Sequence, residues 1–133
     1  MAALMALAWP VSGYAEGALA IGAPQNVAKS GIAFGYANNK PSADEAIQRA
    51  LELCRTAPSS DEAHGLCTLV RSYHDECVAV SMDPKPGTPG AGWAINHTLK
   101  EAEENAMANC EATAGPDRRG HCEASASSCD GSN

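Results

Sequence analysis

Six cysteines and four histidines are the residues of this 133-residue sequence whose side chains are best suited to chemistry. No C-x2-C unit occurs, and no two histidines have the spacing of one helical turn that presents two ligands to zinc. An even number of cysteines in a short chain with few bulky apolar residues is typical of a disulfide framework. We therefore expect no metal site, no cofactor and complete oxidation of the cysteines, which are Cys54, Cys67, Cys77, Cys110, Cys122 and Cys129.

General acid–base chemistry has one candidate run, His74-Asp75-Glu76, and one further histidine, His97. A histidine beside carboxylates can act as a general base. Consecutive strand residues point to opposite faces, however, so a solvated turn between two strands explains the run better. The sequence also lacks a G-x-S-x-G nucleophile motif, and cysteines in disulfides offer no thiolate. We expect a protein that is not an enzyme, with a small hydrolase that uses His74 or His97 as the alternative.

Three charged residues are candidates for contact with a partner. Arg118 and Arg119 form a basic spot on a chain whose net charge is −7, and such a spot could meet an acidic surface. Glu103 falls on the apolar face of a predicted helix, where a carboxylate is costly to bury unless it is paired. The alternative for Glu103 is that this helix lies near a sheet edge and the side chain extends into solvent.

The net negative charge of the chain restricts the classes of partner that we expect. Nucleic acid and anionic lipid surfaces require a basic footprint, so we expect neither as a partner. Acidic surfaces attract basic ones, which makes an inhibitor or immunity protein against a cationic envelope-directed enzyme an alternative function. The candidate contact segments are the two loops between predicted strands, Ala23–Ser30 and Met82–Gly90.

Residues 1–15 are apolar and end in Gly13-Tyr14-Ala15, a small-x-small cleavage pattern, and we interpret them as a signal peptide. The Lys or Arg that normally begins such a peptide is missing, which would fit a start codon further upstream. Residues 16–133 then form a single disulfide-rich domain, and no run in them has the 18 apolar residues of a membrane span. Because disulfides persist in oxidising compartments, we expect a secreted or periplasmic protein, and a monomer.

An internal duplication organises the chain, with halves at about 17–75 and 76–129. Ser42–Cys54 aligns without gaps with Thr98–Cys110, and both segments open with a capping box and continue with the apolar spacing of an amphipathic helix. Two short apolar runs precede each helix: Gly17–Gly22 corresponds to Cys77–Met82, and Gly31–Ala37 to Ala91–His97. A further run follows the cysteine after each helix, at Cys67–Tyr73 and Cys122–Ser128.

Each half thus predicts strand, strand, helix, strand. The predicted fold is α+β, a two-layer sandwich in which a mostly antiparallel sheet of about six short strands carries two helices on one face. Six cysteines allow fifteen pairings. If each half closes its own loop after the helix, the bridges are Cys54–Cys67 and Cys110–Cys122, and Cys77 pairs with Cys129.

The order of these units resembles a known family. The sequence has a first strand at Gly17–Gly22, a helix with Ala46, Ala50, Leu51 and Cys54, a strand at Cys77–Val80 and then a second helix–cysteine unit. This pattern, from about Gly17 to Cys129, is similar to the secreted bacterial domain of unknown function 4189. The resemblance implies a small exported protein, and it supplies no catalytic residues. We expect a non-catalytic binding domain that acts on a protein or a cell-envelope component.

Overall fold

The computed structural model describes residues 15–131, so the expected signal peptide lies outside the described residues except for Ala15. Three short helices lie in loops: α1 (Val27–Ser30), α3 (Asp61–Gly65) and a 3-10 turn η1 (Pro116–Arg118). The main elements follow the predicted order of strand, strand, helix, strand in each half: β1 (Glu16–Gly22), β2 (Ala33–Lys40), α2 (Ala43–Thr56), β3 (Thr68–His74), then β4 (Cys77–Met82), β5 (Ala91–Asn96), α4 (Leu99–Ala114) and β6 (Glu123–Cys129).

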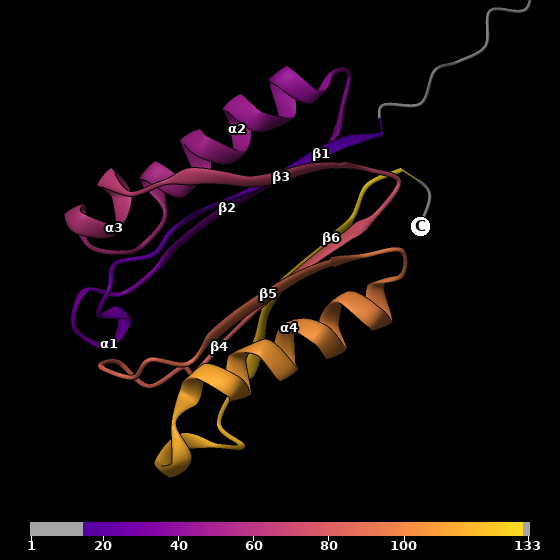
Figure 1. Cartoon of the computed structure of the whole chain (residues 1–133). Helices are drawn as coiled ribbons and strands as arrows, with labels where there is room; N and C mark the ends of the chain where they lie inside the picture. Colours follow the sequence, from indigo (N-terminus) through magenta and orange to yellow (C-terminus); the bar gives the residue numbers. More distant parts are fainter. Residues whose placement is uncertain (1–14, 132–133) are drawn as a thin grey trace, which may run out of the picture.

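The six strands form two antiparallel sheets of three, with orders β2-β1-β3 and β5-β4-β6. The sheets face each other, with α2 outside the first and α4 outside the second (Figure 1). The α+β class and the six antiparallel strands are confirmed, whereas the strands do not join one sheet that carries both helices on one face. The molecule therefore has four layers, helix, sheet, sheet and helix.

The side chains of β1 explain why the sheets stack. Ala18 and Ala20 face α2, while Leu19 and Ile21 point the other way and belong to a core cluster with Val78 of β4. Because successive strand residues point to opposite faces, the small residues lie under the helix and the bulky ones on the other face. Burying that bulky face requires another apolar layer, and the second sheet supplies it.

The two halves repeat each other in detail. Gly35 in β2 and Gly92 in β5 each lie against the backbone of the helix of their own half. The third strand of each half carries one extra, bulged residue at the matching place, between the partners of Leu19 and Ala20 in β3 and of Val80 and Ser81 in β6. By this register, Leu19 of the first half is equivalent to Val80 of the second half, and Gly35 is equivalent to Gly92. The sequence alignment of the strands is corrected accordingly, since it had placed Leu19 on Ala79 and Gly35 on Ile95.

Both helices begin as predicted. The Ser42 hydroxyl accepts a hydrogen bond from the backbone N–H of Glu45, and the Thr98 hydroxyl accepts one from Glu101, each at 3.2 Å. Their buried faces carry alanine and cysteine, which are Ala46, Ala50 and Cys54 in α2 and Ala102, Ala106, Cys110 and Ala114 in α4. Such small side chains let each helix lie directly on the glycine of its sheet.

Three disulfides hold the layers, with the pairing that the duplication predicts. Cys54–Cys67 joins α2 to the start of β3, and Cys110–Cys122 joins α4 to the start of β6. Cys77–Cys129 links directly opposite positions of β4 and β6. Disulfides persist in oxidising compartments, which is consistent with a protein outside the cytoplasm. Between residues 15 and 131, the chain forms no helix that is both long and apolar enough to cross a membrane.

The fully buried Asp130 ties the two sheets together at one end of the molecule. Its carboxylate accepts hydrogen bonds from the backbone N–H groups of Asn39, at 2.7 Å, and Asp75, at 3.0 Å. Both residues have positive φ angles, 57° and 51°, a backbone conformation that residues other than glycine adopt at a cost in free energy. Asp130 itself follows β6, so the end of the second sheet is hydrogen-bonded to β2 of the first sheet and to the β3–β4 connection between the sheets.

We predict that Gly35→Ala destabilises the protein strongly. A Cβ atom at this position would lie 2.1 Å from the carbonyl oxygen of Ala50 and 2.3 Å from the amide nitrogen of Cys54, so helix and sheet must move apart. The free energy of unfolding should fall by about 2 kcal/mol or more, the upper range for overpacking a tight contact. Denaturant unfolding of the oxidised protein, followed by circular dichroism, measures the change.

Gly65→Ala is the matched control, because a Cβ atom on Gly65 in α3 meets no atom within 4 Å. This substitution should leave the stability unchanged or raise it slightly. Equal stability of the two variants would show that the helix contact at Gly35 is not tight.

Candidate functional site

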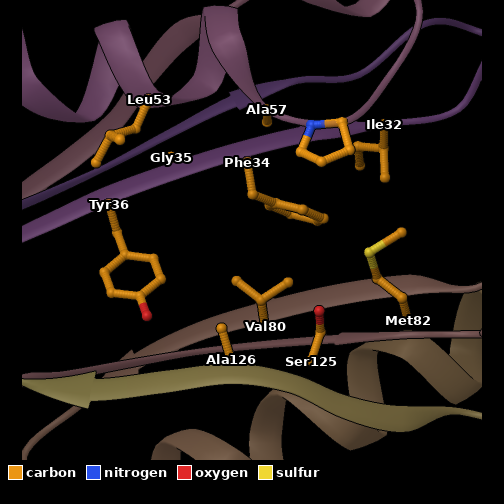
Figure 2. A pocket seen from close by; sticks show the side chains of 11 residues that line it. Ile32, Phe34, Gly35, Tyr36, Leu53, Ala57, Val80, Met82, Ser125 and Ala126 are labelled. Atoms are coloured by element: carbon orange, nitrogen blue, oxygen red, sulfur yellow. The ribbon is translucent and has the colours of Figure 1, made fainter.

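An apolar cleft lies between the two sheets. Gly35 meets α2, and so its neighbours Phe34 and Tyr36 point to the opposite face, toward the second sheet. Val80 and Met82 of β4 point back toward them, as Figure 2 shows. These four side chains form the two facing walls of the cleft.

The cleft has a volume of about 620 Å³ and remains open to solvent. Ile32 extends the wall formed by β2, and the end of α2 forms a rim with Leu53, Ala57 and Pro58. Ser125 and Ala126 of β6 complete the lining on the opposite side. A mostly apolar concave site of this size is typical of small-molecule and side-chain binding sites.

Two hydroxyl groups are the polar side-chain groups that line the cleft. They belong to Tyr36 and Ser125, which approach the space from opposite sheets (Figure 2). Within residues 15–131, neither hydroxyl forms a hydrogen bond with another side chain or with the backbone. Both therefore remain available to a molecule that enters the cleft.

The cleft exists because β6 carries small residues where β3 carries large ones. By strand register, Ser125 and Ala126 occupy the positions that Val70 and Arg71 hold in the first half. The counterpart hollow on the other side, which Trp93 and Thr113 help to line, is smaller, at about 260 Å³. The duplicated scaffold is thus open on one side, where β6 leaves space.

Aromatic packing forms the inner wall of the cleft. The rings of Phe34 and Trp93 meet edge to face with their centroids 6.0 Å apart, one from each sheet. Next to them, Leu19, Ile21 and Val78 belong to the closed part of the same core cluster. The cleft is therefore the open side of the core between the sheets, and its walls are fixed by that core.

Glu103 and Arg119, two of the predicted contact residues, lie away from the cleft. Glu103 is half-buried on α4 and accepts a hydrogen bond of 2.8 Å from the hydroxyl of Ser127, on the outer face of β6. Arg119 is exposed after η1. Glu103 thus has a partner within the chain, and contact of either residue with another molecule stays a prediction.

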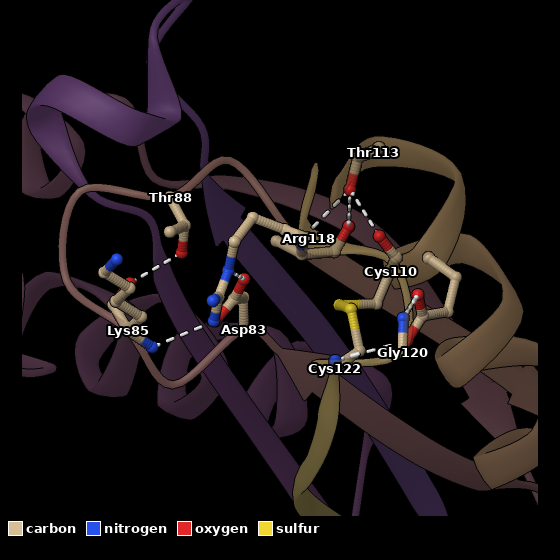
Figure 3. Close-up of a disulfide and its surroundings, with 10 residues drawn as sticks. Asp83, Lys85, Thr88, Cys110, Thr113, Arg118, Gly120 and Cys122 are labelled. Carbon is tan, nitrogen blue, oxygen red and sulfur yellow. Dashed lines mark hydrogen bonds and ion pairs between the residues drawn. A yellow bond between two sulfur atoms is a disulfide. The ribbon is translucent and has the colours of Figure 1, made fainter. Parts of the chain in front are cut away.

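Arg118 forms an ion pair with Asp83 at the start of the β4–β5 loop (Figure 3). Its Nε and terminal nitrogen each donate to one carboxylate oxygen at 2.8 Å, and the backbone N–H of Lys85 donates to the same carboxylate. The guanidinium holds the pKa of Asp83 far below its ordinary value, and the carboxylate raises the pKa of Arg118. Near the Cys110–Cys122 disulfide, this pair fixes the loop to η1.

The histidines considered for catalysis also lie outside the cleft lining. His74 is 61% exposed, and its two ring nitrogens lie 3.1 Å from Glu16 and 3.0 Å from Asp75. Glu16 lies directly opposite His74 on the neighbouring strand β1, and the turn at Asp75 brings the second carboxylate back to the same ring. His97 is exposed. In residues 15–131, no three His, Cys, Asp or Glu side chains converge as metal ligands do.

Arg71 donates two hydrogen bonds of 3.1 Å to Glu76, the third member of the His74–Glu76 run. These bonds hold the pKa of Glu76 below its ordinary value. His74 and Glu76 are thus each engaged with other surface side chains at the β3–β4 turn. The predicted solvated turn between two strands is what this run forms.

Sequence reasoning missed the cleft residues. The alternation of large apolar residues at Phe34 and Tyr36, and again at Val80 and Met82, marks a buried face on each strand. A run of alanine and serine at 124–128 in the strand beside β4 indicates that this face is incompletely filled. These signals predict a cleft only when two stacked sheets are assumed.

We predict that Asp83→Asn removes part of the pH dependence of stability. A carboxyl group whose pKa is lowered by folding stabilises the native state above its ordinary pKa, near 4, and loses that contribution as the pH falls. The variant should be less stable than the parent at pH 7, and the difference should shrink toward pH 2. Thermal unfolding over this pH range measures it.

Asp117→Asn is the control for this prediction, since Asp117 is an exposed carboxylate in the neighbouring turn η1. Its stability should follow that of the parent at every pH. A parent and an Asp83→Asn variant that differ by the same amount at pH 2 and pH 7 would contradict the assigned role of the ion pair.

Comparison with known proteins identifies a family whose pattern extends over nearly the whole described domain. A family model, described as a domain of unknown function (DUF4189), matches residues 17–129 and confirms the resemblance found in the sequence. Neither a curated protein nor a solved structure matches the chain significantly. The match covers both halves of the duplication, from β1 to the end of β6. The chain therefore belongs to the DUF4189 family.

Proposed function

We propose that this protein is a non-catalytic binding domain, secreted or periplasmic, that receives an apolar group of a protein or cell-envelope partner in the cleft between its sheets. The observation that carries this proposal is the open side of the core between Phe34, Tyr36, Val80 and Met82. Burying apolar surface there would remove both the ligand and these side chains from water, which favours association.

The chemistry of the lining supports binding over catalysis. General acid–base catalysis requires a titratable side chain within hydrogen-bond reach of the substrate. The described lining of the cleft offers apolar groups and two hydroxyls. His74 and His97, which a hydrolase would use, belong to other surfaces of the molecule. The hydroxyl on each side of the cleft can form a hydrogen bond with a bound group and so fix its orientation.

The rigidity of the cleft walls supports the same function. One wall is held by α2 and the Cys54–Cys67 disulfide, and the opposite wall by the Cys77–Cys129 disulfide between β4 and β6. A site whose walls are fixed before binding loses less conformational entropy when a ligand enters. The three disulfides also support a location outside the cytoplasm.

We predict that Ala126→Phe strongly weakens binding to the cleft. Ala126 points into the space opposite Tyr36, and a phenyl ring there would fill much of the volume (Figure 2). Titration with the apolar fluorescent probe N-phenyl-1-naphthylamine should show saturable binding to the parent and at least about tenfold weaker binding to the variant, a loss of roughly 1.4 kcal/mol. Fluorescence intensity at fixed protein concentration is the measurement.

Ala124→Phe is the matched control, because Ala124 lies in the same strand, is exposed and does not line the cleft. It should bind the probe as the parent does. Circular dichroism and thermal unfolding establish that both variants fold. Failure of the parent to bind the probe, or equal binding by the two variants, would overturn the proposal.

A further inference from the structure

A second hollow continues the cleft at the end marked by Ile32 and Met82. These two residues line both spaces, so the cleft and the hollow adjoin. The hollow has a volume of about 290 Å³ and lies between α1 and the β4–β5 loop. It is thus bounded by parts of the two loops that the sequence indicated as contact segments, Ala23–Ser30 and Met82–Gly90.

Two lysines line this second hollow, Lys29 from α1 and Lys85 from the β4–β5 loop. Both are exposed, and neither ammonium group forms an ion pair with a side chain of residues 15–131. The charge of the buried Asp83, which also lines the hollow, is already matched by Arg118. The free lysines therefore give this hollow a local positive charge.

A carboxylate beside α1 belongs to Glu62, and it accepts a hydrogen bond of 2.6 Å from the hydroxyl of Ser30. It does not line the hollow, whereas both lysines do. The chain has a net charge of −7, so the two cations at the end of the apolar cleft have the opposite sign to the charge of the protein as a whole. An ammonium group is a compact point charge that suits a carboxylate.

Resting on the proposed function, we propose that the occupant of the cleft is a single medium-chain fatty acid. Its hydrocarbon chain would lie between Phe34 and Tyr36 on one side and Val80 and Met82 on the other, and its carboxylate would lie at Lys29 and Lys85. The wall from Ile32 to Tyr36 spans about 13 Å, at roughly 3.3 Å per strand residue, which suits a chain of medium length.

The lining and the charge favour this occupant over two others. A peptide would bring backbone N–H and C=O groups that each require a partner when buried, and the lining side chains offer two hydroxyls. An anionic membrane surface would be repelled by the net charge of the whole protein. A single fatty acid brings one carboxylate, which the two lysines meet locally, and an otherwise apolar body.

Competition against bound N-phenyl-1-naphthylamine tests the proposal on the full oxidised domain. The competitors are decanoate, decanol and decylphosphocholine, each below its micelle concentration, and an apolar tetrapeptide. The same titrations are made with Lys29→Gln/Lys85→Gln. The charge-matched control is Lys40→Gln/Lys100→Gln, since neither of these lysines lines the cleft or the hollow.

We expect decanoate to displace the probe at lower concentration than the other competitors. In Lys29→Gln/Lys85→Gln its affinity should fall about fivefold, the effect of losing roughly one surface ion pair, and should become similar to that of decanol. The control variant should keep the preference. Affinity in the parent should rise with each added methylene until the cleft is full.

Several outcomes would overturn the proposal. Equal displacement by decanoate and decanol in the parent would remove the role of the lysines, and tighter binding of decylphosphocholine or the tetrapeptide would identify a lipid headgroup or a protein partner instead. A probe that binds in an Ala126-dependent manner but is not displaced by decanoate would also overturn it, while leaving the proposed function intact. Absence of probe binding to the parent, or equal probe binding by Ala126→Phe and Ala124→Phe, counts against both.

Discussion

The contact of a helix backbone with a strand glycine determines how each half of this domain is built. At Gly35 and again at Gly92, the helix backbone lies where a Cβ atom would have to be. The contact requires alanine on the helix face, as at Ala50 and Ala106. It also fixes which face of the strand meets the helix, so that the neighbours of each glycine point toward the other sheet. The stacking of the sheets follows from that choice.

The hydrogen bonds, ion pair and disulfides that connect parts of the two sheets lie toward the two ends of the strands, away from the middle of the cleft. At one end, Asp130 accepts hydrogen bonds from β2 of the first sheet and from the β3–β4 connection, next to the Cys77–Cys129 disulfide. At the other end, the Asp83–Arg118 pair fixes the β4–β5 loop beside the Cys110–Cys122 disulfide. A domain with alanine-faced helices buries little apolar area per contact. Hydrogen bonds, ion pairs and disulfides of this kind therefore contribute a larger share of its stability.

Local patterns predicted the six strands, the two long helices and the disulfides, because capping, helical spacing and duplication act within short segments. Ser42 and Thr98 cap the helices, and the cysteine pairing follows the repeat. The number of layers could not be predicted in this way, since an apolar strand such as β1 fits a single sheet or a stacked pair equally well. The cleft depends on that choice, as does the partner of Asp83, which lies 35 residues away.

Departures from the internal symmetry carry the features that a binding function would need. The two halves share their caps, glycines and bulges, and these positions are committed to the scaffold. Ser125 and Ala126 replace the larger Val70 and Arg71, which opens the cleft. On the outer face of the same strand, Glu103 stands where α2 has Ile47 and bonds to Ser127, so it holds β6 while its inner face remains open. One half can therefore diverge to form a site while the caps, glycines and bulges that the two halves share maintain the fold.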